Sequence, residues 1–85
     1  MRTYRVTFDR IGRNHAVPEL TTTAANLDDL AENVHDYARR YLVSNDYEVS
    51  VRGAEDVEEV EVSDKGKVYI GWGRYGTGTF EEVPA

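Results

Sequence analysis

Apolar residues between Asn26 and Leu42 recur every three or four positions, which is the spacing of a helix with one buried face. The members of this apolar stripe are Leu27, Leu30, Ala31, Val34, Ala38, Tyr41 and Leu42. Asn26 is a residue type that caps helix N-termini, and Asp29 follows it three positions later, as in a capping box. Arg39 and Arg40 lie near the other end, where positive charge complements the helix dipole. The pattern predicts one amphipathic helix between these two ends.

Two segments alternate apolar and polar residues, which is the period of a strand with one buried face. The first is Tyr4–Asp9 and the second, after the predicted helix, is Tyr47–Arg52. A turn over residues 10–14 leads from the first strand into an extended stretch at His15–Val17, so a hairpin is expected there. The β-branched run Thr21–Thr23 is expected to continue extended toward the helix.

The C-terminal third of the chain predicts a second hairpin after a polar break. Val60 and Val62 alternate with glutamates, as in a strand with one polar face. Asp64–Gly66 is a turn signal, and it is followed by the strand-like run Val68–Trp72. Glycines and aromatic residues then lead to an expected last short strand near Thr79–Val83.

These elements predict an α+β fold, in which an antiparallel β-sheet carries one amphipathic helix packed on one face, in the order β-β-(β)-α-β, plus a C-terminal β-hairpin. The chain of 85 residues is expected to form a single domain. Within it, residues 1–52 are the predicted core unit and residues 53–85 an acidic hairpin appendage, which either extends the sheet or packs beside it. The helix stripe is expected to pack on Tyr4, Val6, Phe8, Val49 and Val51.

The charge of the chain is acidic and unevenly placed. The net charge is -6, and residues 1–52 hold 7 basic and 8 acidic side chains, whereas residues 53–85 hold 3 and 8. Such a surface repels phosphate backbones, so a basic protein partner is favoured and direct nucleic-acid binding is not expected. Because the chain has no cysteine, no apolar run of membrane-spanning length and no signal-peptide core, we expect no membrane association and a cytoplasmic location.

Two short motifs match chemical signatures but lack the surroundings that the chemistry needs. Gly71–Gly76 fits G-x-G-x-x-G, yet a dinucleotide site requires a following helix, and only nine residues remain, including Pro84. Glu32 and His35 have the i, i+3 spacing of carboxylate-bridged metal sites, which need further glutamates on facing helices. Neither His35 nor His15 can be placed beside a nucleophile and an acid. We therefore expect no cofactor, no metal and no enzymatic activity.

Four aromatic residues, Trp72, Tyr69, Tyr75 and Phe80, lie among glycines near a single cation, Arg74. Because a base-stacking platform also needs a basic groove, packing or a protein contact is the favoured interpretation of these aromatic residues. The acidic run that precedes them would attract a basic partner. The predicted partner-binding residues are Glu55, Asp56, Glu58, Glu59, Glu61, Trp72 and Tyr75.

The order of motifs over about residues 3–52 resembles the HicB-like antitoxin family. The segments that carry the resemblance are Thr3–Phe8, a short turn, Ala16–Leu20 with its Val-Pro-Glu-Leu sequence, a threonine-rich stretch, and Leu27–Leu30 at the opening of the helix. Thr21–Thr23 stands where the family usually has a Gly-Cys segment. No helix-turn-helix or ribbon-helix-helix pattern follows, so DNA autoregulation is not expected.

The resemblance implies a β-β-β-α-β partial RNase H-like fold without catalytic carboxylates, whose members mask a small basic toxin and commonly form homodimers. On this basis the chain is expected to be a non-enzymatic protein-binding module. An alternative is a phage or mobile-element accessory protein that inhibits a host nucleic-acid-binding protein by mimicking phosphate charge. A third alternative is a small RNA- or nucleotide-binding domain.

Overall fold

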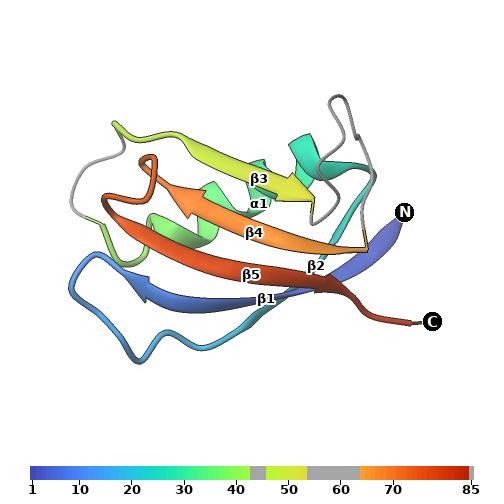
Figure 1. Cartoon of the computed structure of the whole chain (residues 1–85), viewed down its shortest axis with the longest axis horizontal. Coiled ribbons are helices and arrows are strands. Elements are labelled where there is room, and N and C mark those ends of the chain that lie inside the picture. The colour runs from blue at the N-terminus through green and yellow to red at the C-terminus, as the bar shows by residue number, and fades with distance from the viewer. Residues whose placement is uncertain (43–45, 54–63, 85) are drawn as a thin grey trace.

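The computed structural model describes residues 1–42, 46–53 and 64–84, which form a five-stranded antiparallel sheet and one helix (Figure 1). The elements are β1 (Arg2–Ile11), β2 (Leu20–Ala24), α1 (Leu27–Ala38), β3 (Val49–Gly53), β4 (Lys65–Ile70) and β5 (Gly76–Glu82). The strand order is β2-β1-β5-β4-β3, and every neighbouring pair is antiparallel. The predicted α+β class, with one helix on one face of an antiparallel sheet and a C-terminal hairpin, is confirmed.

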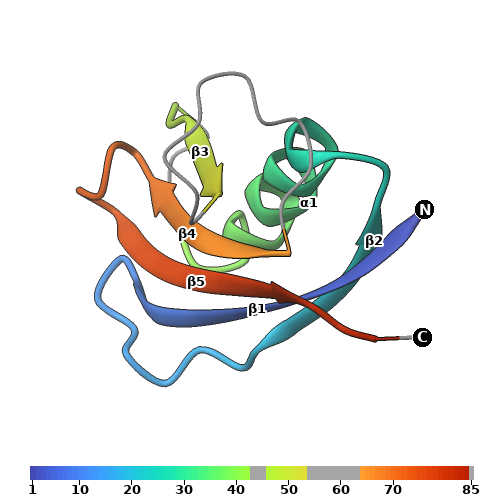
Figure 2. The ribbon, with the colours of Figure 1, turned by 45° about the vertical axis from the view of Figure 1, so that its right-hand side comes forward.

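The helix α1 lies across one face of the sheet and contacts the edge strands β2 and β3 (Figure 2). Its buried side is the predicted stripe, because Leu27, Leu30, Val34 and Ala38 are its buried residues. These side chains form one core with Tyr4, Val6 and Phe8 of β1, Val68 and Ile70 of β4, and Phe80 of β5. Tyr41, Val49 and Val51 pack against this core while partly exposed. The predicted orientation of the helix is therefore confirmed.

The two ends of α1 differ in how well the sequence predicts them. At the N-terminus, Asn26 Oδ1 accepts a hydrogen bond from Asp29 N at 2.9 Å, and Asp29 Oδ2 accepts one from Ala25 N at 3.2 Å, so the predicted cap is confirmed. At the other end, α1 stops at Ala38 and not at Leu42. There the backbone tightens into i→i+3 hydrogen bonds, such as the one from the N–H of residue 41 to Ala38 O at 2.9 Å.

The first hairpin pairs β1 with the threonine run and not with the stretch His15–Val17, which is a loop. The backbone of this loop bonds to side chains instead of to a neighbouring strand. Ala16 N donates to Asn14 Oδ1 at 2.9 Å, and Pro18 O accepts from the Tyr37 hydroxyl at 2.7 Å. Two strands therefore precede α1, where the β-β-β-α-β order implied by the family resemblance has three.

One prediction for the second hairpin is wrong and another falls outside the described residues. Lys65 and Gly66, expected in a turn, belong to β4. Gly66 lies opposite Gly53 on one side and Phe80 on the other, and a Cβ at this glycine would be 2.7 Å from Cε1 of the Phe80 ring. Glycine allows close packing within the sheet at this position. In the sequence, the same glycine after Asp64 is typical of a turn. Val60 and Val62 lie outside the described residues.

The C-terminal hairpin is part of the main sheet and not an appendage to it. The strand expected near Thr79–Val83 is β5, which runs over Gly76–Glu82 and lies in the centre of the sheet between β1 and β4. The strand order joins β3 to β1 through β4 and β5. A boundary at residue 53 would therefore separate strands that share one sheet, and of the two expected arrangements of the C-terminal hairpin the structure has the one in which it extends the sheet.

Candidate protein-binding site

The predicted aromatic contact residues Trp72 and Tyr75 lie in the turn over residues 71–75, which connects β4 to β5. Trp72 is 72% exposed and Tyr75 is 42% exposed. Together with Met1, they are the exposed large hydrophobic residues of the described part of the chain. The predicted acidic contact residues Glu55, Asp56, Glu58, Glu59 and Glu61 lie outside the described residues.

Trp72 has a backbone conformation that a bulky L-residue rarely adopts. Its φ is +60°, and the flanking Gly71 and Gly73 have φ values of +58° and +90°. No other non-glycine residue in the described ranges has a positive φ. A left-handed conformation costs an L-residue roughly 1–2 kcal/mol, and such strain persists only where the surroundings fix the backbone.

Backbone hydrogen bonds fix this turn to the neighbouring strands. Gly71 N donates to Glu48 O at 2.6 Å, which ties the turn to the segment before β3. Gly73 N and Tyr75 N both donate to Ile70 O, each at 3.1 Å. The turn therefore presents the Trp72 side chain from a rigid backbone.

Arg10 of β1 holds the same turn from the other side. Its Nη2 donates to Arg74 O at 2.9 Å and to Gly73 O at 3.3 Å, while its Nη1 donates to Gly12 O at 2.8 Å. Gly12 N in turn donates to Tyr75 O. The register of β1 against β5 shifts just before Arg10, and such a bulge redirects a side chain. Nothing in the sequence indicates this contact, since Arg10 and the turn are more than sixty positions apart.

Trp72 borders a groove of about 540 Å³ between the turn and the segment before β3. The groove is lined by Asp46, Tyr47, Glu48, Gly71, Trp72, Arg74 and Tyr75. The Tyr75 ring packs edge-on against the Tyr47 ring, with centroids 6.4 Å apart. Asp46 and Glu48 are exposed, so two carboxylates lie beside the aromatic side chains. A cationic side chain fits this combination, because aromatic faces and carboxylates both attract it.

The two short motifs, Glu32 with His35 and Gly71–Gly76, do not have the surroundings of a metal or dinucleotide site in the described part of the chain. The His35 ring stacks on the Tyr47 ring at 4.4 Å between centroids, and His35 O accepts from the Tyr47 hydroxyl at 2.9 Å. Burial raises the pKa of Tyr47. Among the described residues, no three His, Asp or Glu side chains come together as metal ligands would. Gly71–Gly76 leads into β5, so this motif lacks the helix N-terminus that holds pyrophosphate.

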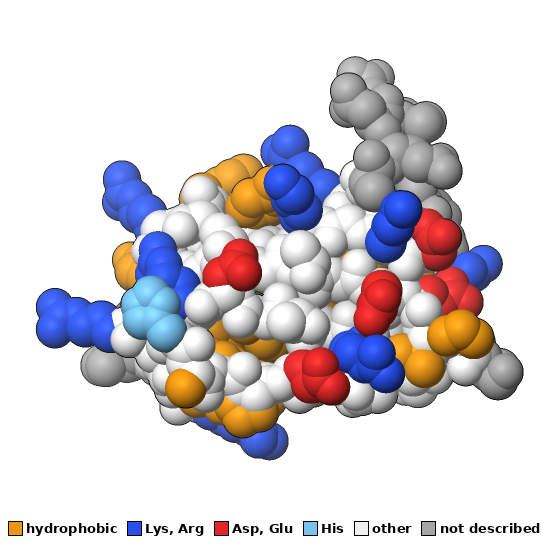
Figure 3. Space-filling model, turned by 60° about the horizontal axis from the view of Figure 1, so that its bottom comes forward, with side chains coloured by type: hydrophobic (Ala, Val, Ile, Leu, Met, Phe, Trp, Pro, Cys, Tyr) orange, Lys and Arg blue, Asp and Glu red, His pale blue; other side chains and the backbone are white. Residues whose placement is uncertain are grey.

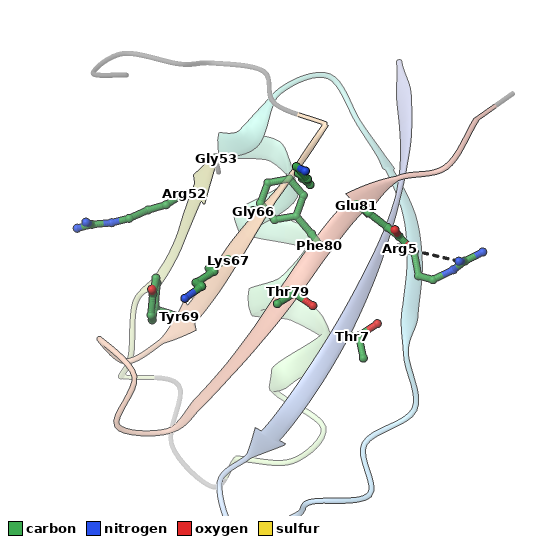
Figure 4. A pocket seen from close by; sticks show the side chains of 11 residues that line it. Arg5, Thr7, Arg52, Gly53, Gly66, Lys67, Tyr69, Thr79, Phe80 and Glu81 are labelled. Atoms are coloured by element: carbon green, nitrogen blue, oxygen red, sulfur yellow. Dashed lines mark hydrogen bonds and ion pairs between the residues drawn. The ribbon is translucent and has the colours of Figure 1, made fainter. Parts of the chain in front are cut away.

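The face of the sheet opposite α1 carries a shallow hollow of about 620 Å³ (Figure 4). Its charged and polar lining consists of Arg5, Thr7, Arg52, Lys65, Lys67, Tyr69, Thr79 and Glu81. These residues come from four strands, so the sequence does not show that the cations lie together. In Figure 3, several cationic side chains gather at the left end of the molecule and most of the described acidic side chains lie to the right. We refer to the hollow on the sheet face opposite α1, with the lining given above, as the cationic hollow.

The helix of the described part of the chain is too short to cross a lipid bilayer. In comparisons with known proteins, no family model, no curated protein and no solved structure matches this chain significantly.

Proposed function

We propose that this chain is a small non-enzymatic protein-binding module that masks a basic partner, in the manner of the HicB-like antitoxins that residues 3–52 resemble. The observation that carries the proposal is Trp72, a mostly exposed indole on a strained but firmly bonded turn. Strained backbone that the surrounding structure maintains is typical of binding and catalytic positions. Tryptophan and tyrosine are also the residues that most often anchor protein interfaces.

Charge supports a basic partner. The chain carries a net charge of -6, and the carboxylates of Asp46 and Glu48 border the groove beside Trp72. The acidic run from Glu55 to Glu61 adds to the field that would attract such a partner. Complementary charge mainly raises the association rate, whereas a buried aromatic anchor mainly slows dissociation. The two contributions can therefore be measured separately.

The test starts with capture of partners from the native host by the immobilised full chain, followed by kinetics with the purified partner. Trp72 is the single tryptophan of the chain, so its fluorescence reports burial of the anchor without a label. We expect a basic partner, a blue shift of Trp72 emission on binding, and release at least tenfold faster for Trp72→Ala. Replacing Glu58, Glu59 and Glu61 by glutamine should slow association and flatten its salt dependence.

The matched control is Arg13→Ala, an exposed substitution in the loop between β1 and β2. It should leave the association and dissociation rates unchanged. Capture of only acidic or neutral partners would contradict the proposal. So would a captured complex whose kinetics are the same for the wild type, Trp72→Ala and the triple glutamine variant.

A further inference from the structure

The cationic hollow contains two positive side chains that face each other across neighbouring strands. Arg52 of β3 and Lys67 of β4 are directly opposite in the antiparallel register, and both are exposed. The row continues with Thr79 of β5 and Thr7 of β1, which bear hydroxyl groups and no charge. In Figure 4, Lys67 lies between Arg52 and Thr79 on the face turned toward the viewer.

Neither Arg52 nor Lys67 forms an ion pair with a residue of the described part of the chain. Like charges directly opposite each other in a sheet are destabilising. By contrast, Arg5 in the same hollow has Glu81 at 3.2 Å and Glu19 at 3.7 Å. In a chain with more acidic than basic residues, two neighbouring surface cations that have no ion-pair partner among the described residues indicate a site for an external anion.

An aromatic ring lies beside these cations. Tyr69 follows Lys67 by two residues in β4, so both side chains are on the same face, roughly 7 Å apart along the strand. Tyr69 is partly exposed and lies opposite Ser50 of β3 and Thr77 of β5. A flat sheet face that combines cations for the backbone with an aromatic ring for a base is how proteins bind single-stranded nucleic acid. An acidic peptide would satisfy the cations but make no use of the ring.

We propose that the cationic hollow binds a single strand of nucleic acid, with Arg52 and Lys67 on phosphate oxygens and Tyr69 against a base. The site is separate from the Trp72 groove, so it goes beyond the protein-binding function proposed above. The net charge of the chain opposes an approaching strand, but Coulomb energy falls with distance, so cations in contact with phosphate contribute more than charges elsewhere on the chain. Binding is therefore local, tightest at low salt, and strongly weakened by added salt.

The test uses the full chain and fluorescent ten-nucleotide strands of deoxythymidine and of uridine, titrated at several salt concentrations by fluorescence anisotropy. We expect saturable binding. The logarithm of the association constant should fall linearly with the logarithm of the salt concentration. Lys67→Gln and Arg52→Gln should each weaken binding and reduce the magnitude of that slope by about 0.7, the loss of one phosphate contact. Tyr69→Leu should weaken binding several-fold, and Tyr69→Phe should preserve it.

Three controls separate this site from general effects. Arg13→Gln removes an exposed cation in the loop between β1 and β2 and should not change binding. Trp72→Ala should also leave it unchanged, which distinguishes this proposal from the protein-binding function. Urea denaturation of Lys67→Gln should show equal or greater stability, because the like-charge pair is relieved, so weaker binding by this variant would not reflect unfolding.

Competition with unlabelled polyphosphate and poly-glutamate of matched charge identifies the class of ligand. We expect the oligonucleotides to be displaced poorly by either competitor, because neither offers a base to Tyr69. The proposal is overturned if neither oligonucleotide binds at low salt. It is also overturned if Lys67→Gln and Arg52→Gln behave like Arg13→Gln, or if either competitor binds as tightly as the oligonucleotides and Tyr69→Leu has no effect.

Discussion

Trp72 shows how one residue combines an energetic cost with an exposed surface. Its φ of +60° would suit glycine, and glycines occupy the positions on either side. The side chain is 72% exposed, so core packing offsets little of this cost. Hydrogen bonds that Arg10 donates, and others that the carbonyl oxygens of Ile70 and Glu48 accept from the turn, maintain the conformation instead. A bulky residue at this position therefore fits a role in binding better than a role in stability.

Replacing Trp72 by glycine should stabilise the fold. Glycine adopts positive φ without strain, whereas alanine at the same position retains the strain. We expect the free energy of unfolding of Trp72→Gly to exceed that of Trp72→Ala by about 1 kcal/mol. Urea denaturation followed by circular dichroism measures both variants. Equal stability of the two would show that the turn relaxes in solution and that Trp72 is not held in the left-handed region.

The helix is the element that the sequence predicts best, because the apolar stripe that predicts it is also the face that it buries against the sheet. An apolar stripe at helical spacing must be covered, and here it is covered by the sheet face that carries Tyr4, Val6 and Phe8. Both Leu30 and Val34 have no exposed surface. Where the stripe becomes partly exposed, at Tyr41 and Leu42, the helical hydrogen bonds have already ended.

Leu30→Ala should destabilise the protein by roughly 2–5 kcal/mol, because it leaves a cavity in the centre of the core. Glu32→Ala, on the exposed side of the same helix, should change the free energy of unfolding by less than about 0.5 kcal/mol. Urea denaturation of the two variants side by side provides the measurement. If both were equally stable, α1 would have a different face toward the sheet in solution.

At the scale of the whole molecule, the first and last strands hold the sheet together. β1 and β5 are neighbours in the centre, and Val83 N donates to Thr3 O at 2.8 Å beyond the end of β5. These pairings join residues from opposite ends of the chain, and the two termini lie on the same side of the molecule in Figures 1 and 2. Folding therefore requires the C-terminal hairpin.

A fragment of residues 1–53 should not fold, because it leaves β3 without its partner β4 and exposes one edge of β1. Circular dichroism and thermal denaturation of the fragment, compared with the full chain, would show the loss of a cooperative transition. A cooperative transition in the fragment would instead support an independent N-terminal unit. Adding a synthetic peptide of residues 64–85, which supplies β4 and β5, should restore the cooperative transition.

Stability should fall in alkaline solution because the buried Tyr4 and Tyr47 and the partly buried Tyr37 are in their neutral form. Burial, with a further contribution from the Tyr41 hydroxyl, raises the pKa of Tyr37 to about 12, and burial also raises the pKa of Tyr4 and of Tyr47. Since an unfolded tyrosine has a pKa of about 10, this contribution is complete below pH ~10 and is lost as the pH rises toward 12. Urea denaturation across this range tests the trend. In Tyr37→Phe the alkaline loss should be smaller, and an equal loss would contradict the assignment to Tyr37.

The sequence by itself determined the elements whose periodicity reflects burial: the helix with its Asn26 cap, the first strand, and the α+β class. It also indicated that Trp72 lies in a turn, because glycines surround it. The sequence did not determine the order of the strands or the hydrogen bonds from Arg10 to the turn over residues 71–75. It also did not determine the grouping of Arg52 with Lys67 and Tyr69. Local patterns arise from contacts a few residues apart, whereas these features depend on which strands pair across the sheet. That choice is made only when the whole chain buries its core.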